Sequence, residues 1–240
     1  MTINPPYLKD KDSNILYFPP KFYVRSESIS RRSSLIQLPF SNLSKETSDG
    51  CFNPRRVDVT GILYAADETE AQTLLDSIHT FSSKKDLELW YKGRRIKVDK
   101  LLESSLQDTG KKGFLYNVSI SYQAGDPFWY SEEKLADLSN KGVLSIGGSA
   151  ETYPRLIITT SGPGDQIWLK VNDLECRLSG SFKAGDIIEI DSYNGTVEIN
   201  SEDALSSFTG FFPHLSPGDN SFEYEGPISS IVVLYSEAYV

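Results

Sequence analysis

Two carboxylates have the spacing of a catalytic pair: Glu189 and Asp191, in the segment Asp-Ile-Ile-Glu-Ile-Asp that ends at Asp191. In an extended strand, residues two positions apart point to the same side, with Cα atoms roughly 7 Å apart. That separation suits the paired acids of glycoside hydrolases. Ile188 and Ile190 alternate with the two acids, however, which is the pattern of a half-buried strand with solvated carboxylates on its outer face. We favour this second interpretation, because nothing nearby in the sequence would raise a carboxyl pKa.

The histidines and cysteines form no recognisable nucleophile or metal site. His79 lies beside an isoleucine on a predicted helix and is interpreted as a surface group, and His214 has no companion at metal-ligand spacing. Chain order does not exclude a Ser-His-Asp triad, but no G-x-S-x-G elbow occurs. Cys51 and Cys176 lack C-x-x-C or Cys/His spacing, so we predict two small buried side chains rather than a zinc site or a disulfide.

Phosphate-cradling and dinucleotide-binding glycine motifs are also missing from the sequence. We therefore predict no catalytic residue, no metal ligand and no cofactor, and hence a protein that is not an enzyme.

Charge is distributed unevenly along the chain. Residues 1–150 carry 20 Lys and Arg against 19 Asp and Glu, whereas residues 151–240 carry 4 against 14. Basic pairs occur in the first part, at Arg31-Arg32, Arg55-Arg56, Lys84-Lys85, Arg94-Arg95 and Lys111-Lys112. Nucleic acid is one partner that such pairs could serve, but binding to phosphates requires clustered positive charge in net excess. The near-equal numbers of positive and negative charges in residues 1–150 favour solvated charges or polar contacts between subunits. The different charge of residues 151–240 suggests two modules in different surroundings.

Aromatic side chains offer a second candidate surface. Trp129, Trp168, Tyr193 and Phe211-Phe212 could form a platform on which sugars stack. Core and interface positions are the commoner use of such residues, and we favour that interpretation. Hydrophobic residues make up 39% of the chain, which excludes a disordered class, and no apolar run reaches the roughly 20 residues of a membrane span. We expect a soluble protein made in a cytoplasm.

The elements that would position these residues are mostly strands. In the first half we predict a helix over about 67–83, in which Asp67 caps the first turn together with Glu70. Its apolar stripe consists of Ala71, Leu74, Leu75, Ile78 and Phe81. Strands are predicted at 57–64, with Val57, Val59, Ile62 and Tyr64 on one face and Gly61 at a bulge or close approach, and at 114–124. A hairpin is predicted over 87–102, and 42–54 is interpreted as a long loop or an exposed hairpin.

The second half reads as nearly all β. Short strands are predicted at 156–160, 167–171, 174–178, 187–191, 197–200, 222–224 and 231–235, with turn residues such as Asn172-Asp173 and Asn194-Gly195 between them. Regular short strands of this kind are typical of a β-sandwich or jelly roll. A domain boundary is predicted in the polar stretch 126–148, which gives domains 1–130 and 131–240.

A series of short motifs resembles the distal tail proteins (Dit) of siphophages. The first is Gly61-Ile-Leu-Tyr followed by Glu-Ala-Gln-Thr-Leu-Leu, and the second is Tyr122-Gln-Ala-Gly-Asp-Pro-Phe-Trp-Tyr, which matches the family's domain junction. The later motifs are Tyr153-Pro-Arg-Leu-Ile-Ile, Phe182-Lys-Ala-Gly-Asp-Ile-Ile-Glu-Ile-Asp, Asn194-Gly-Thr-Val, Phe212-Pro-His-Leu-Ser-Pro-Gly-Asp-Asn and the closing Val-Leu-Tyr-Ser-Glu-Ala-Tyr. Their order along nearly the whole chain carries the resemblance.

The resemblance implies a mainly β protein with a tail-tube-like N-terminal domain that contains one helix, and a galectin-like C-terminal β-sandwich. It implies a structural virion component that forms a homohexameric ring through residues 1–130. Such a ring would join the tail tube to the tail-associated hub protein in the baseplate and leave a central channel for DNA. Receptor-binding proteins are expected as partners of the C-terminal sandwich, and a membrane is not.

Three other interpretations of the sequence stay open. A carbohydrate-binding module that attaches to the host surface would need exposed aromatics on the sandwich. A β-sandwich hydrolase would use Glu189 and Asp191. A related tail-like particle, such as a contractile injection system or a gene-transfer particle, would use the same ring architecture.

Overall fold

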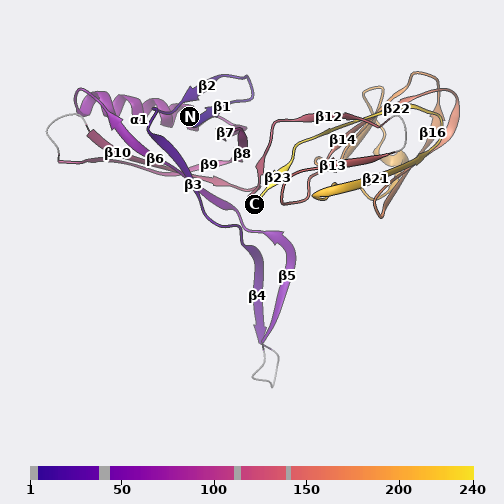
Figure 1. The fold of residues 1–240 in the computed structure, drawn as a ribbon, viewed down its shortest axis with the longest axis horizontal. Helices are drawn as coiled ribbons and strands as arrows, with labels where there is room; N and C mark the ends of the chain where they lie inside the picture. Colours follow the sequence, from indigo (N-terminus) through magenta and orange to yellow (C-terminus); the bar gives the residue numbers. More distant parts are fainter. Residues whose placement is uncertain (1–4, 38–43, 111–114, 139–141) are drawn as a thin grey trace. The chain divides into compact units, whose positions relative to one another are not determined.

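The chain folds into two compact units in the computed structural model, which describes residues 5–37, 44–110, 115–138 and 142–240 (Figure 1). The side chains of residues 31–51 lie outside this description. Unit 1 is Met1–Trp129 with Val240, and unit 2 is Tyr130–Tyr239. Most of the described elements are antiparallel strands, so the mainly β class predicted from the sequence is confirmed. No helix in the described ranges has both the length and the apolar character of a membrane span.

Unit 1 is built around two sheets. The first is part of a six-stranded sheet in which β2-β1-β7-β8 are successive neighbours, from β1 (Tyr7–Lys9), β2 (Ile15–Tyr17), β7 (Leu87–Tyr91) and β8 (Arg94–Val98). The second has the order β3-β6-β10-β9, from β3 (Phe22–Ser26), β6 (Arg55–Tyr64), β9 (Lys100–Asp108) and β10 (Leu115–Ala124), and is called the four-stranded sheet below. Two further strands, β4 (Arg31–Gln37) and β5 (Ser44–Phe52), pair with each other as a separate hairpin. The stretch interpreted as a loop or a hairpin thus contains a strand, although residues 38–43 lie outside the described ranges.

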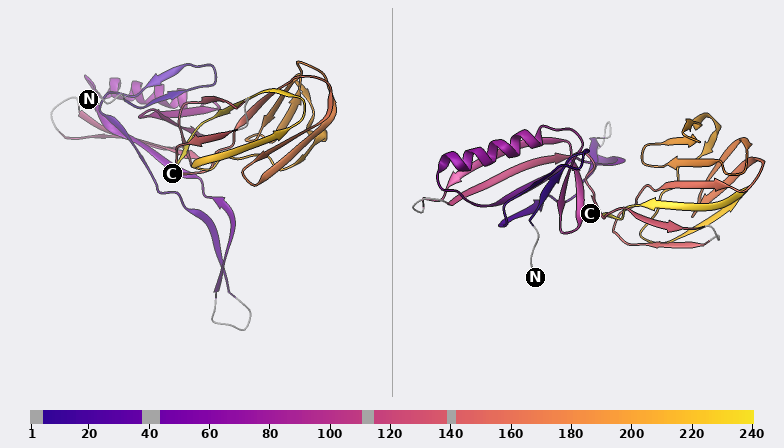
Figure 2. Two further views of the ribbon diagram at one scale, coloured as in Figure 1. Left: turned by 45° about the vertical axis from the view of Figure 1, so that its right-hand side comes forward. Right: turned by 90° about the horizontal axis from the view of Figure 1, so that it is seen from above.

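Helix α1 (Glu68–Ser82) forms where the apolar stripe and the cap predicted it. The Asp67 side chain accepts from the backbone N–H of Glu70 at 2.8 Å, and Glu70 Oε2 accepts from the N–H of Ala66 at 2.5 Å. Ala71, Leu75 and Ile78 are buried, which turns the stripe toward the four-stranded sheet. Two hydrogen bonds tie the helix to that sheet: Ser82 Oγ to Tyr122 Oη at 2.9 Å and His79 Nε2 to Ser104 Oγ at 2.6 Å. Figure 2 shows α1 lying along the strands.

One predicted strand face is wrong. In β6, the residues that face the core are Val57, Val59 and Leu63, whereas Ile62 and Tyr64 are 40% and 57% exposed. The pairing of β6 with β10 runs without a register shift, so Gly61 marks no bulge between these strands. It marks a close approach instead, because a Cβ at this position would lie 2.4 Å from Cδ2 of Phe22. Phe22, on neighbouring β3, fills the space that a side chain at position 61 would occupy.

The hairpin predicted over 87–102 is shorter than expected. Its strands are β7 and β8, and its turn is Lys92-Gly93, where both residues have positive φ as a two-residue turn of this kind requires. Leu101 and Leu102 belong to the next strand, β9. A bulge in β9 near Tyr122 of β10 changes which of its side chains face outward from this point.

Unit 2 is a β-sandwich of two antiparallel sheets. One has the order β12-β22-β14-β17-β18-β19 and the other the order β13-β21-β15-β16-β20. The first comprises β12 (Lys134–Asp137), β14 (Arg155–Thr160), β17 (Ile187–Asp191), β18 (Thr196–Ile199), β19 (Glu202–Asp203) and β22 (Ile228–Tyr235). The second comprises β13 (Val143–Ile146), β15 (Gly164–Val171), β16 (Leu174–Phe182), β20 (Phe208–Gly210) and β21 (Gly218–Glu225). Both sheets supply the apolar core between them, as the two layers in Figure 2 indicate.

Only some of the turns in unit 2 have the form that their residues predict. Asn172-Asp173 forms a two-residue turn between β15 and β16, with Asn172 at φ 53. The turn at Asn194-Gly195 is longer, because Asp191 pairs with Thr196 and four residues lie between them. Strands β12 and β13 lie in the stretch that we interpreted as a polar boundary region. A short helix η1 (Leu205–Ser207) precedes β20, and β11 (Trp129–Tyr130) and β23 (Ala238–Tyr239) lie where the chain passes between the units.

Candidate functional site

The carboxylate pair has structural partners in the sandwich. Ile188 and Ile190 are buried in the core, which leaves the acids on the outer side of β17. Glu189 accepts from Arg155 Nη1 at 3.2 Å. Asp191 accepts from the N–H groups of Tyr193 and Asn194 and from Asn194 Nδ2, so its oxygens cap the turn after β17. Both carboxylates are therefore held by neighbouring residues of the strand or the turn.

The remaining predicted groups are dispersed. His79 is half-buried against Ser104 rather than free on the surface, and His214 Nε2 lies 3.8 Å from Glu151 Oε1. Cys176 is a free, buried thiol whose pKa is raised to about 12 by burial, as expected of a small core residue. The side chain of Cys51 lies outside the described residues. Within the described ranges, no three His, Cys, Asp or Glu side chains gather as metal ligands would.

The aromatic residues do not form one platform. Trp129 is buried in unit 1. In unit 2, Phe212 stacks on Phe208 with 4.6 Å between ring centroids, and Phe211 is 67% exposed beside them. Tyr193 is exposed in the turn after β17, and Trp168 is half-buried on β15. Trp168 is therefore the aromatic of this group that lies on the face of a sheet.

Basic residues of unit 1 are engaged by neighbouring groups. The buried guanidinium of Arg55 donates to the carbonyls of Glu27 and Pro127 at 2.7 and 2.9 Å, and burial lowers its pKa. Lys84 pairs with Asp10 at 2.6 Å, and Arg95 pairs with Glu88 at 2.5 Å. The side chains of Arg31-Arg32 and the pair Lys111-Lys112 lie outside the described residues. The described pairs thus serve local structure, which removes much of the positive charge that a nucleic acid would need.

The uncovered face of the four-stranded sheet is the most organised polar surface of unit 1. Side chains that alternate with the core residues point away from α1. They include Tyr23 and Arg25 on β3, Arg56, Asp58 and Thr60 on β6, Asn117, Ser119 and Ser121 on β10, and Glu103, Ser105 and Gln107 on β9. Hydroxyl and amide groups occupy its centre, around an open hollow of about 450 Å³ that Ser105, Gln107, Asn117 and Ser119 help to line.

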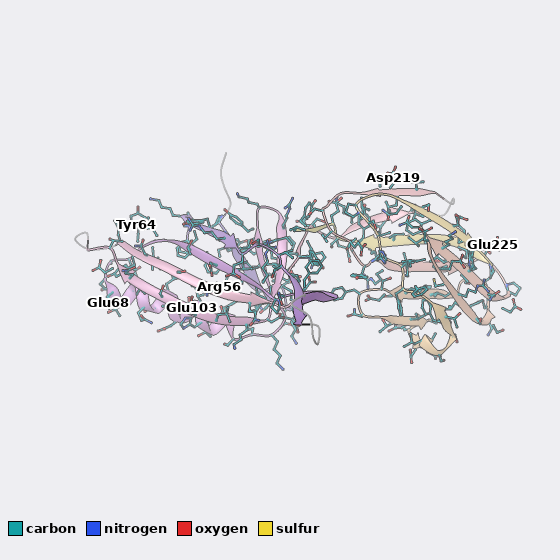
Figure 3. All side chains as sticks on the ribbon, turned by 90° about the horizontal axis from the view of Figure 1, so that it is seen from below. Arg56, Tyr64, Glu68, Glu103, Asp219 and Glu225 are labelled. Atoms are coloured by element: carbon teal, nitrogen blue, oxygen red, sulfur yellow. The ribbon has the colours of Figure 1, made fainter. Side chains whose placement is uncertain are left out.

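A charge network occupies one end of this face. Arg56 Nε donates to Asp58 Oδ1 at 2.9 Å, and its Nη2 donates to Glu103 and to Ser121 Oγ. Ser121 in turn donates to Asp58 at 2.6 Å. The hydrogen bonds that Arg56 donates to Asp58 and, second, to Glu103 raise the pKa of the arginine. Figure 3 shows Arg56 and Glu103 labelled on this sheet.

Aromatic rings engage two further cations: Lys21, beside Tyr64 at the other end of the face, and Arg25, which lies opposite Asp58. Lys21 Nζ donates to Tyr64 Oη at 2.6 Å and lies 4.6 Å from the centroid of that ring. Arg25 lies 5.2 Å from the ring centroid of Tyr23. Carboxylates therefore compensate the charge of Arg56, whereas aromatic rings engage Lys21 and Arg25.

Both edges of the four-stranded sheet are open among the described strands. β3 pairs with β6 and β9 pairs with β10, and neither has a second strand partner. β9 is nine residues long and its side chains are mostly exposed. A long, open edge is a template for pairing with another chain.

Comparisons with known proteins identify a domain and a fold. Residues 147–239 match the family model described as the siphovirus-type tail component, C-terminal domain. The whole chain is similar to the crystal structure of the Dit protein of SPP1, which is described as a paradigm of the hub adsorption apparatus in phages that infect Gram-positive bacteria. That match has a TM-score of 0.76 and 15% identity, and covers 98% of this chain and 99% of the other. No curated protein sequence matches the chain.

These findings confirm the resemblance that the motif series indicated. The family match lies within unit 2, and the structural match extends the Dit fold to unit 1. The network around Arg56 is not recognisable in the sequence. The alternation of Arg56, Asp58 and Thr60 with buried valines indicates one outward face, but the partner Glu103 is 47 positions away, across a bulged strand.

Proposed function

We propose that this Dit-like structural component of a siphophage tail closes into a hexameric ring that connects the tail tube to the tail-tip adsorption apparatus. The observation that carries the proposal is the four-stranded sheet, with α1 on one face, a charge-compensated polar surface on the other, and two open edges. The ring would have no catalytic activity and would leave a central channel for DNA.

The edges supply the closing contact. If β3 of one copy lies beside β9 of the next, the contact is heterologous, and a ring results when the rotation between copies closes. Pairing satisfies the free N–H and C=O groups of both edges and removes the risk of uncontrolled strand addition. Residues 1–130 would then carry the ring contacts.

The uncovered face suits a channel wall. Six copies of the four-stranded sheet would give a barrel of about 24 strands, roughly 50 Å across at the backbone for strands about 4.8 Å apart and tilted by about 40°. DNA presents one negative charge per roughly 1.7 Å of its axis and adheres to uncompensated cations. Asp58 and Glu103 neutralise Arg56, and Lys21 is held against Tyr64, so hydroxyls, amides and engaged cations make up most of the wall. DNA can pass such a surface without being retained.

The partners follow from this position in the tail tip. One side of the ring would meet the tail tube protein and the other the tail-associated hub protein. The acidic unit 2 would be available to receptor-binding proteins. The family match of unit 2 to a tail component and the Dit fold of the whole chain support this placement.

The direct test is the mass and shape of the purified full-length protein, with and without its genomic neighbours from the tail region. Six chains of 26.8 kDa give about 161 kDa, which light scattering on a sizing column resolves from a monomer. Electron microscopy of the same fraction should show closed six-fold rings with a hollow centre. A protein that stays monomeric alone and in the presence of coexpressed tube and hub proteins would overturn the ring.

A further inference from the structure

Unit 2 has an uncovered face on the sheet β13-β21-β15-β16-β20. Along β15, Ile167, Leu169 and Val171 are buried in the sandwich core. Because successive residues of a strand point to opposite faces, Trp168 and Lys170 lie on the outer face. Trp168 is half-buried there, whereas the outward residues of the neighbouring strands are exposed. A large aromatic ring therefore lies near the centre of an otherwise polar surface.

Strand register places charged side chains on both sides of the indole. Trp168 lies opposite Arg177 of β16 and Glu225 of β21. The adjacent row places Lys170 opposite Glu175 and Glu223. Cβ atoms of directly opposed residues are about 4.5–5.5 Å apart, so these side chains surround the ring at close range. We call these six residues the Trp168 face: Trp168, Lys170, Glu175, Arg177, Glu223 and Glu225. Figure 3 labels Glu225 on β21.

The polar groups of the Trp168 face are not used by the protein itself. Within the described part of the chain, the side chains of Lys170, Glu175, Arg177, Glu223 and Glu225 form no hydrogen bond and no ion pair. On the opposite sheet of the same unit, Arg155 of β14 and Glu189 of β17 are diagonal neighbours across the strand pair and do form an ion pair. The Trp168 face thus combines an aromatic ring with donors and acceptors that keep their full bonding capacity.

We propose that the Trp168 face binds a neutral oligosaccharide. A pyranose ring has an apolar C–H surface that packs on an indole, and hydroxyl groups at its rim that both donate and accept. Arg177 offers a rigid fork of donors and Glu225 two acceptor oxygens, one on each side of the ring. A few oriented polar groups beside an aromatic surface are the usual composition of a small-ligand site.

Charge selects a neutral ligand over an anionic one. Residues 151–240 carry 14 acids against 4 bases, and three carboxylates belong to the Trp168 face itself. A polyanion such as teichoic acid would meet a repulsive field, whereas a neutral hexose polymer would not. This inference goes beyond the proposed ring and does not depend on it, because every residue of the Trp168 face lies within unit 2 of one copy.

The test uses the full-length protein and a panel of neutral oligosaccharides of two to six residues, in gluco, galacto, manno, rhamno and N-acetylglucosamine configurations. Teichoic acid and heparin serve as anionic probes. Binding is measured by immobilised-glycan array and then by calorimetry. We expect at least one neutral oligosaccharide to bind, and Trp168→Ala, Arg177→Ala and Glu225→Gln each to weaken that binding about tenfold or more. Arg177 and Glu225 are exposed, so these two variants test the site even where Trp168→Ala impairs folding.

Matched controls are Tyr193→Ala and Phe211→Ala, which remove exposed aromatics elsewhere on unit 2 and should leave binding unchanged. Three results would overturn the proposal: no binding to any neutral member of the panel, binding confined to the anionic probes, or neutral binding that survives Arg177→Ala and Glu225→Gln. The mass of each variant, measured in parallel, keeps the outcome separate from the ring, because these substitutions lie outside unit 1.

Discussion

The four-stranded sheet of unit 1 and the sheet β13-β21-β15-β16-β20 of unit 2 each turn one face to a core and leave the other uncovered, but they treat exposed charge in opposite ways. On the first, Arg56 bonds Asp58 and Glu103, and Lys21 lies on Tyr64. On the second, Arg177 and Glu225 flank Trp168 without such bonds among the described residues. A face whose polar side chains already bond one another offers few contacts to a ligand, whereas a face whose polar side chains lack partners can bind one.

The edges of the two sheets differ in the same sense. The edge strands of the four-stranded sheet are β3 and β9, and β9 spans nine residues. In the unit 2 sheet the edges are β13 and β20, of four and three residues. Short edge strands discourage pairing with another chain, whereas a long one invites it. Unit 1 is therefore suited to assembly through its edges, and unit 2 to recognition through a face.

The largest expected effect comes from Gly61→Val, which attacks the attachment of the β3 edge. A Cβ there would lie 2.6 Å from Cγ and 2.8 Å from Cα of Phe22, so β3 must shift away from β6. We expect unit 1 to lose about 1–3 kcal/mol of stability or more and the proposed ring not to form. Calorimetry should show the unit 1 transition lowered, with the unit 2 transition unchanged.

Gly162→Val is the matched control for this substitution, because no atom lies within 4 Å of a Cβ at that position. It should leave both transitions and the mass unchanged. A Gly61→Val protein that kept its hexamer and its unit 1 transition would show that the β3 edge is not part of the ring contact.

The next prediction concerns the two hydrogen-bonding edges of β9, one of which pairs with β10 while the other is open. Consecutive N–H groups of an antiparallel edge strand point alternately toward the partner strand and away from it. One of Ser104→Pro and Ser105→Pro therefore breaks a backbone bond to β10, while the other removes a backbone donor at the open edge. Ser104→Ala is the control for the side-chain bond to His79 that Ser104→Pro also removes. We expect the first variant to melt at lower temperature and the second to fold but remain monomeric. If the variant with native stability is still hexameric by light scattering, β9 does not close the ring.

Local patterns predicted the elements better than they predicted the faces. α1 follows from its stripe and from the Asp67 cap, which are properties of residues close in sequence. The face of β6 was wrong beyond Val59, because Ile62 is as apolar as the valines and Tyr64 is largely so. The sequence also does not reveal that Phe22 fills the space beside Gly61. Which side of a strand is buried is decided by its neighbours as well as by its own alternation.

The candidate surfaces, like the strand faces, could not be predicted from local sequence alone. The residue type of Trp168 suggests stacking, as do those of several other aromatics, but only the register with Arg177 and Glu225 separates it from Phe211 and Tyr193. Arg56 was counted as half of a basic pair with Arg55. The strand sends the two guanidiniums to opposite faces, one to buried carbonyls and the other to exposed acids. The role of each residue depends on which strands pair, and the spacing of residues along the sequence does not reveal that pairing.

A smaller effect comes from one buried carboxylate in each unit. Asp10 bonds Lys84 and Asn14, and Glu237 bonds Lys134 and the N–H of Gly147; these contacts lower both pKa values to about 2. A lowered pKa stabilises the fold fully above the ordinary value, near 4, and this stabilisation fades as pH falls toward 2. Asp10→Asn should lower the melting temperature of unit 1 at pH 7, and Glu237→Gln that of unit 2.

The difference between each variant and the parent should shrink when melting is repeated at pH 3 and 2.5, because the parent then loses the same charge. Asp12→Asn and Asp165→Asn, at exposed positions of units 1 and 2, serve as matched controls that should leave both transitions unchanged. If Asp10→Asn shifted the unit 2 transition, the two units would not unfold separately and the comparison between them would fail.

The smallest effects test the comparison most directly, by removing one arginine from each uncovered face. Arg56→Ala leaves Asp58 and Glu103 close together without their shared cation, so the unit 1 transition should fall by about 1–3 °C. Arg177→Ala removes an exposed side chain with no bonded partner in the described chain, and the unit 2 transition should not move. Thermal scans at low and high salt measure both, and only the Arg56 effect should weaken with salt, because screening acts on a pair that exists. If the two variants lower the melting temperatures of their units equally, Arg177 already bonds another group of the protein. The Trp168 face would then have no more free polar groups than the proposed channel wall.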